Sequence, residues 1–343
     1  MVRPLRMFMR ISYQNKSILN PPRINLSIPA TLKKFLMNRF ALLLLTTVSL
    51  IMLSCSGNNI GPKPLPDNYE QLHQEWLDYR ISALTDTTDW LRLQNLIWFE
   101  EGENSFGSGS DQDIQFPEGS IPDYAGAFIL DNGSVTMVVN DGVDIRHKGE
   151  PVDTLKMVGD DIEERIHAKY GPLTWFIDSR NDQRGVKVFS MDTPKADRFD
   201  GFPAYPLQQE WYHNARFVPH QEETTIEIAN VLGEVVDEYS PGSIEFQIDG
   251  EIYSIDAFES SSGLFLMFTD STNRTETYQA GRYMIIDPPA EDGSVTLDFN
   301  KAYNPPCAFN PFTTCQLPPQ QNRLDVAIPA GEKRPVEWDG IQL

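Results

Sequence analysis

The chain has 343 residues, of which 40% are hydrophobic and 11% aromatic, so it can bury a core and is neither fibrous nor disordered. It carries 28 Lys and Arg against 49 Asp and Glu, a net charge of -21. Such acidity repels nucleic-acid backbones and anionic lipid headgroups, so we expect no nucleic-acid partner and no polybasic membrane docking.

Residues 1–54 are typical of a signal peptide. They contain 8 Lys and Arg and no Asp or Glu, and they end in the apolar run Phe40–Leu53. A run of this length is too short to span a bilayer as a helix but suits the hydrophobic region of a signal peptide. Met37 offers an alternative start of the chain.

Leu53-Ser54-Cys55 closes the apolar run and resembles the lipobox of bacterial lipoproteins. The resemblance implies a lipid on Cys55 and membrane contact through that lipid alone. It places the protein in the bacterial cell envelope, and we expect the outer membrane. The glycines and prolines of residues 55–66 predict a lipidated tether.

Residues 67–88 predict one amphipathic helix. Asp67 and Glu70 have the spacing of a capping box. The helical stripe that we expect to pack on the next sheet contains Tyr69, Leu72, Trp76, Tyr79 and Ala83.

Residues 89–195 predict an antiparallel β-sandwich, because short β-branched and aromatic runs alternate with turns rich in Gly, Asn and Asp. Within it, Asp160–Lys169 predicts a short helix. The spacing of residues 102–114 resembles the start of a forkhead-associated domain, which implies a shared scaffold. Ser108 stands where that family has its phosphate-binding Arg, so phosphopeptide binding is not expected.

Residues 196–343 predict a second antiparallel β-barrel or sandwich, which makes the chain mainly β with one N-terminal helix. Asp249-Gly250 marks a tight hairpin. Two Pro-Pro pairs fix the backbone of the loop 298–323, so we expect that loop to be ordered and to line a pocket.

This second region contains Tyr303-Asn304-Pro305-Pro306-Cys307, followed by Cys315 and Asn322. It resembles the signature of a bacterial family known as domain-of-unknown-function family 1684. The resemblance extends over nearly the whole exported chain. The resemblance implies that this region is a domain of that family, but it assigns no activity to the domain.

The polar residues of this signature are candidates for a ligand site. The candidate ligand-binding residues are Tyr278, Arg282, Asn300, Tyr303, Asn304 and Asn322. In the functional interpretation Arg282 orients an anionic group and Asp298 is an acid or base. In the structural interpretation the same side chains satisfy the backbone of the loop.

Cys307 and Cys315 are the cysteines left beside Cys55. In an oxidising compartment such a pair predicts a disulfide. A catalytic thiol is the alternative, with His213 or His220 as its base, whereas a zinc site lacks further ligands nearby. We expect no metal and no cofactor.

Two functions remain open at this point. The first is a binding or accessory module for a small molecule, glycan or protein at the envelope. The second is an enzyme, such as a hydrolase, with Arg282, Asp298, Asn304 and Cys307 in its site.

Overall fold

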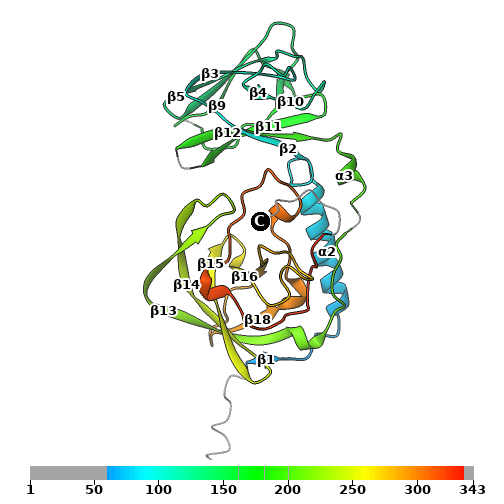
Figure 1. Cartoon of the computed structure of the whole chain (residues 1–343), viewed down its shortest axis with the longest axis vertical. Coiled ribbons are helices and arrows are strands. Elements are labelled where there is room, and N and C mark those ends of the chain that lie inside the picture. Colours follow the sequence, from blue (N-terminus) through cyan, green and yellow to red (C-terminus); the bar gives the residue numbers. More distant parts are fainter. Residues whose placement is uncertain (1–59, 161, 181, 200, 336–343) are drawn as a thin grey trace, which may run out of the picture. The chain divides into compact units, whose positions relative to one another are not determined.

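A computed structural model describes residues 60–335 except 161, 181 and 200 (Figure 1). The predicted signal peptide, the alternative start at Met37 and the lipidation site Cys55 lie outside these residues. Within the described part of the chain, no helix combines the length and apolarity needed to cross a bilayer.

The end of the predicted tether is part of the fold. Strand β1 (Gly61–Pro62) pairs with residues of a long central strand, and the backbone N–H of Lys63 donates to Tyr212 O at 2.8 Å. Residues 61–63 are therefore attached to a sheet, and only residues before them are left to act as a tether.

Helix α2 (Tyr69–Thr85) lies within the predicted range, but its N-terminus differs from the prediction. The capping box of Asp67 and Glu70 is wrong, because the helix is capped by Asn68, which makes no side-chain capping hydrogen bond.

The predicted apolar face of α2 is wrong in part. Tyr69 is buried as predicted, but Leu72 and Tyr79 are 40% and 72% exposed, and the other buried residues of the helix are His73 and Leu84. Tyr69 and His73 hydrogen-bond to the C-terminal region of the chain and not to the next sheet, so polar contacts select the buried face (Figure 1).

The first β region is a sandwich of two sheets, as predicted. One sheet has the order β2 (Leu93–Trp98), β12 (Gln183–Ser190), β11 (Leu173–Arg180), β10 (Ala168–Tyr170), β7 (Arg146–His147) and β8 (Glu150–Pro151). The other has the order β4 (Ile114–Gln115), β3 (Gly102–Gly107), β5 (Gly126–Asp131), β6 (Ser134–Val139) and β9 (Thr154–Val158).

Apolar residues from both sheets form one core, in which Phe106 contacts both Phe128 and Trp175. All strand pairs of the sandwich are antiparallel except β3 with β4. The short helix predicted over Asp160–Lys169 is wrong, because its last residues form β10 and the described residues before them are irregular. Their backbone is anchored instead by the carbonyl of His167, which contacts His147 Nδ1 at 2.8 Å.

The second β region is a curved, half-barrel sheet of antiparallel strands, which confirms the predicted mainly-β fold. Its order is β1, β13 (Tyr212–Ala229), β14 (Val235–Ile248), β15 (Glu251–Ser260), β16 (Gly263–Phe268) and β17 (Arg282–Ile286), and β18 (Ser294–Asp298) pairs with β13. The predicted Asp249-Gly250 hairpin is confirmed, since both residues have the positive φ of 51° and 89° that its turn requires.

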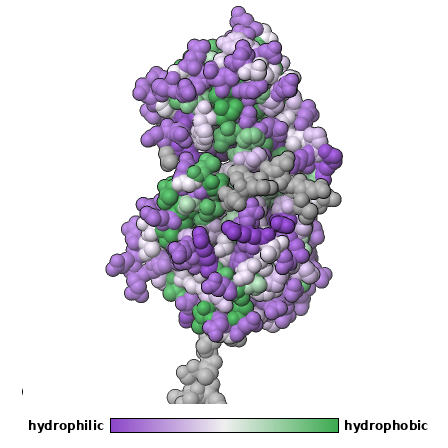
Figure 2. Space-filling view, viewed as in Figure 1, coloured by the Kyte–Doolittle hydropathy of each residue, from purple (hydrophilic) through white to green (hydrophobic). Residues whose placement is uncertain are grey.

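A four-residue helix α3 (Pro194–Asp197) and the 3-10 helix η1 (Gln209–Trp211) connect the two β regions. The face seen in Figure 2 is mainly hydrophilic, with scattered apolar groups. The large apolar residues are concentrated in the two cores instead, for example Phe246, Phe268 and Phe299 in the half-barrel.

The turn after α2 contains a carboxyl group whose ionisation opposes folding. Burial, together with the charge of Asp86, raises the pKa of Asp89 to about 6. A raised folded-state pKa stabilises the fold below about pH 4, and this stabilisation is lost as the pH rises through 6. We predict that Asp89→Asn raises the free energy of unfolding at pH 7 by about 1 kcal/mol, after allowance for solvent screening, and not at pH 4.

Urea denaturation at the two pH values measures this difference. Asp141→Asn, in an exposed turn, is the control and should change stability by less than about 0.5 kcal/mol at either pH. An equal gain for Asp89→Asn at both pH values would contradict the prediction.

Candidate functional site

The chain after β18 crosses the half-barrel without regular strands. Up to residue 335, where the described part of the chain ends, three short 3-10 helices interrupt it: η2 (Phe299–Lys301), η3 (Pro306–Ala308) and η4 (Gln320–Asn322). Most of the segment is nevertheless buried. Buried backbone groups without a strand partner must find other hydrogen bonds, and this need determines what the signature residues do.

Arg282, the predicted anion-orienting residue, holds the chain end on the sheet. Its guanidinium is fully buried and pairs with Asp270 at 2.5 Å. It also donates to the carbonyls of Ile328 and Ala330. Asp270 in turn accepts hydrogen bonds from Thr272 and the Ile328 N–H. Arg282 therefore braces the fold and has no free face for a ligand.

Asp298, the predicted acid or base, is buried and fully engaged. Tyr69 of α2 donates to both of its oxygens at 2.9 Å, and Asn300 donates from its backbone and side chain. Burial raises the pKa of the Asp298 carboxyl. Asn300 also bonds both backbone groups of Gln208. These residues attach both α2 and the segment that leads into β13 to the end of β18.

Asn304 and Tyr303 lie at a second attachment point of α2. The Asn304 N–H donates to Glu332 at 2.8 Å, and Arg80 of α2 donates to both the Asn304 carbonyl and Glu332. The Arg80 guanidinium lies over the Tyr303 ring, 4.6 Å from its centre. Both candidates thus bind α2 to the chain end.

Asn322 and Tyr278 are buried braces as well. Asn322 accepts from Asp256 N and donates to the carbonyls of Asp256 and Met267, which fixes η4 against β15 and β16. The Tyr278 hydroxyl donates to the Cys307 carbonyl at 3.1 Å. The structure therefore distributes the six predicted ligand residues over several bracing contacts and does not gather them around one cavity.

Cys307 and Cys315 are neighbours, buried, and free thiols in the structure. The Cys307 N–H donates to Cys315 Sγ at 2.9 Å. Hydrogen bonding to Cys315 lowers the pKa of the Cys307 thiol, and burial raises the pKa of Cys315 well above its usual range. Their adjacency is compatible with the predicted disulfide, which stays a prediction.

The structure does not bring His213 or His220 to these thiols. His213 packs against Trp211 and Phe299 in the half-barrel core, and His220 hydrogen-bonds Ser240. Among the described residues, no group of three or more His, Cys, Asp or Glu side chains is placed to hold a metal ion.

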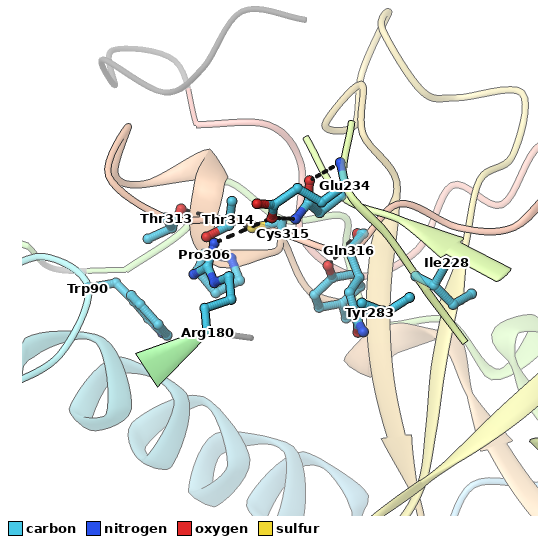
Figure 3. A pocket seen from close by; sticks show the side chains of 12 residues that line it. Trp90, Arg180, Ile228, Glu234, Tyr283, Pro306, Thr313, Thr314, Cys315 and Gln316 are labelled. Carbon is cyan, nitrogen blue, oxygen red and sulfur yellow. Dashed lines mark hydrogen bonds and ion pairs between the residues drawn. The ribbon is translucent and has the colours of Figure 1, made fainter. Parts of the chain in front are cut away.

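Cys315 is one of the residues that line a cavity of about 350 Å³ (Figure 3). Trp90 and Arg180 lie to one side of Cys315, and Gln316, Tyr283 and Ile228 lie to the other (Figure 3). The lining also includes Asn230, Glu234, Val236, Pro306, Thr313 and Thr314. It thus combines an indole, an opposed pair of charges, amides and hydroxyls.

The polar groups of this cavity are only partly used by the protein. Glu234 accepts from Asn230 at 2.6 Å, but its oxygen lies 3.9 Å from Arg180, which is too far for a hydrogen bond. Arg180 Nη1 and Thr314 Oγ1 are buried and have no hydrogen-bond partner within the described residues. These atoms can still form hydrogen bonds with a bound molecule.

The site residues predicted from the sequence do not include Trp90, Arg180, Glu234 or Thr314. Arg180 ends β11 and Glu234 lies in the turn between β13 and β14, so they come from segments far apart in the chain. Thr314 lies next to Cys315 of the signature, but no sequence signal separates it from Thr313, whose hydroxyl is bonded to Asn310 O.

Residues 197–333 match the family described as "Protein of unknown function (DUF1684)", which confirms the resemblance over the second β region. A solution NMR structure of an uncharacterized protein of Haloarcula marismortui is 32% identical, with 42% of this chain and 81% of that chain covered and a TM-score of 0.35. No curated protein matches the chain.

The bracing role of the Arg282–Asp270 pair gives a stability prediction. Asp270→Asn leaves the buried guanidinium without its counter-charge, so we expect the free energy of unfolding to fall by about 3–5 kcal/mol. The measurement is urea denaturation followed by tryptophan fluorescence.

The matched control removes the carboxylate of the largely exposed Arg216–Glu245 pair. Glu245→Gln should cost less than about 1 kcal/mol. Similar losses for the two variants would show that the buried pair does not brace the fold.

Proposed function

Since the chain belongs to the DUF1684 family, whose description assigns no activity, we propose a function from the cavity of Figure 3: a lipid-anchored envelope protein that binds a small neutral, hydroxyl-rich ligand of the glycan class. The lipid on Cys55 attaches the protein to the outer membrane. The cavity holds the ligand.

The observation that supports a ligand most directly is the pair of polar atoms that the protein leaves unbonded. An unmade hydrogen bond of a buried donor or acceptor costs about 1–3 kcal/mol. Arg180 Nη1 and Thr314 Oγ1 both carry this cost at the wall of one cavity. A ligand hydroxyl can accept from the guanidinium and donate to, or accept from, the threonine.

The charge and shape of the cavity favour a neutral ligand with an apolar face. Arg180 and Glu234 oppose each other, so their charges nearly cancel. The indole of Trp90 offers a flat apolar surface, and such rings pack against the C–H face of a sugar as readily as against another ring. Amide groups of Asn230 and Gln316 add donors and acceptors.

The enzyme alternative has less support. Arg282 and Asp298 are committed to internal hydrogen bonds, and Asn304 is fully buried beside Glu332. None of these three lines the cavity of Figure 3. A catalytic acid or nucleophile must reach its substrate, so we propose binding and not catalysis.

Membrane attachment is tested separately from ligand binding. We predict that labelled palmitate enters the protein in a bacterial host and that Cys55→Ala abolishes the label. Cys307→Ala serves as the matched control and should leave the label unchanged. Label in the Cys55→Ala protein, or in neither protein, would contradict the proposed anchor.

Ligand binding is tested with two neighbouring threonines. We predict that the protein binds neutral oligosaccharides on a glycan array and that Thr314→Val weakens this binding about three- to tenfold. Its stability should be unchanged or slightly higher, because the lost hydroxyl has no partner within the described residues.

Thr313→Val is the matched control for the fold. It removes the 2.8 Å hydrogen bond to Asn310 O and should lower the free energy of unfolding by about 1 kcal/mol. If Thr314→Val destabilises the protein as much as Thr313→Val, or if no oligosaccharide binds, the proposed ligand site is wrong.

A further inference from the structure

A second cavity, of about 410 Å³, lies within the family-matched region and shares no lining residue with the first. It is formed by the chain around 269–274, by Gln279 and Ala280, and by the chain around 317–323. Two exposed arginines, Arg274 and Arg323, are among its lining residues.

Neither guanidinium has a hydrogen bond, ion pair or ring contact with any other described residue; the Arg274 carbonyl, but not its side chain, accepts a bond from Arg334. Both guanidinium groups can therefore form hydrogen bonds with a molecule outside the chain.

The backbone around Arg274 is held in an unfavourable conformation. Arg274 has a φ of 74°, which a residue with a side chain rarely adopts. Asn273 fixes the turn, because its side chain accepts from Asp270 N and donates to Tyr278 O, and Arg274 N donates to Thr277 O. Such conformations cost about 1–3 kcal/mol and are concentrated at functional sites.

Arg323 projects from an equally fixed segment. Residues 322 and 324 hydrogen-bond the backbone of Thr269, so Thr269 and Arg323, which both line the cavity, form an isolated β-bridge. Asn322, just before it, is fully buried by its bonds to β15 and β16. The two arginines therefore start from rigid positions, which lowers the entropy cost of binding.

The charge at this cavity is positive. Asp270 is the acidic lining residue, and its charge is neutralised by the buried ion pair with Arg282. Glu276, close in sequence, and Asp325, two residues after Arg323, do not line the cavity. Among the lining residues the charges of Arg274 and Arg323 are therefore uncompensated, and the hydroxyl of Ser271 adds a further donor.

We infer that this second cavity binds the phosphate group of a small molecule or lipid headgroup through Arg274 and Arg323. Two guanidinium forks match the tetrahedral oxygens of phosphate and give charge-assisted hydrogen bonds. The site is independent of the proposed glycan site, because the two cavities share no residue.

The test is isothermal titration of the full-length protein in detergent at low ionic strength. The probes are inorganic phosphate, glycerol 3-phosphate and water-soluble dihexanoyl phosphatidylglycerol, so that free phosphate, a soluble ester and a lipid headgroup are separated. At least one should bind saturably. We expect Arg274→Gln and Arg323→Gln each to weaken that binding about tenfold.

Arg146→Gln removes an exposed arginine of the sandwich and is the matched control, which should bind as the wild type does. Thr314→Val should also bind phosphate normally, which separates this site from the first cavity. Both arginines are exposed, so their variants should fold, and urea denaturation verifies this. Absence of saturable binding to all three probes, or an equal loss in Arg146→Gln, would overturn the inference.

Discussion

The buried guanidinium of Arg282 is the contact on which the C-terminal half of the structure depends. After β18 the described chain continues over the half-barrel without forming a ladder, and only isolated bridges such as Tyr283–Tyr303 join it to the sheet. Arg282 supplies the missing donors to Ile328 and Ala330, and Asp270 supplies the counter-charge that makes its burial possible. A buried arginine is tolerated when its charge is paired and hydrogen-bonded in this way.

The same constraint explains the position of helix α2. Its partners, Asp298, Asn304 and Glu332, are polar groups of the C-terminal segment that need donors. Tyr69 and Arg80 supply them from one face of the helix. The helix is therefore attached to the DUF1684 region by hydrogen bonds more than by an apolar stripe, although it comes more than a hundred residues earlier in the chain.

This arrangement shows what the sequence could and could not predict. Alternating apolar runs and the Asp249-Gly250 turn predicted the strands, because burial on one face of a sheet leaves a pattern of period two. The predicted buried face of α2 was wrong at Tyr79. A helical wheel counts this tyrosine as apolar, but the position of the residues that the helix contacts determines which of its sides is buried. The signature residues were correctly selected as unusual, but residue type alone does not tell a ligand contact from a brace. That distinction requires the hydrogen-bond partner, which is contributed by residues distant in the sequence.

The polar side chains that take no part in these bracing contacts are the ones left to bind another molecule. Arg282 and Arg274 are eight residues apart and chemically identical, yet both terminal nitrogens of the Arg282 guanidinium are hydrogen-bonded, whereas the Arg274 side chain has no partner among the described residues. Thr313 and Thr314 differ in the same way. In this fold, side chains hydrogen-bond many backbone groups of irregular segments. The same kind of contact could pair the few remaining polar groups. Where the fold leaves strong donors unused beside a cavity, binding of an external molecule explains their presence better than packing does.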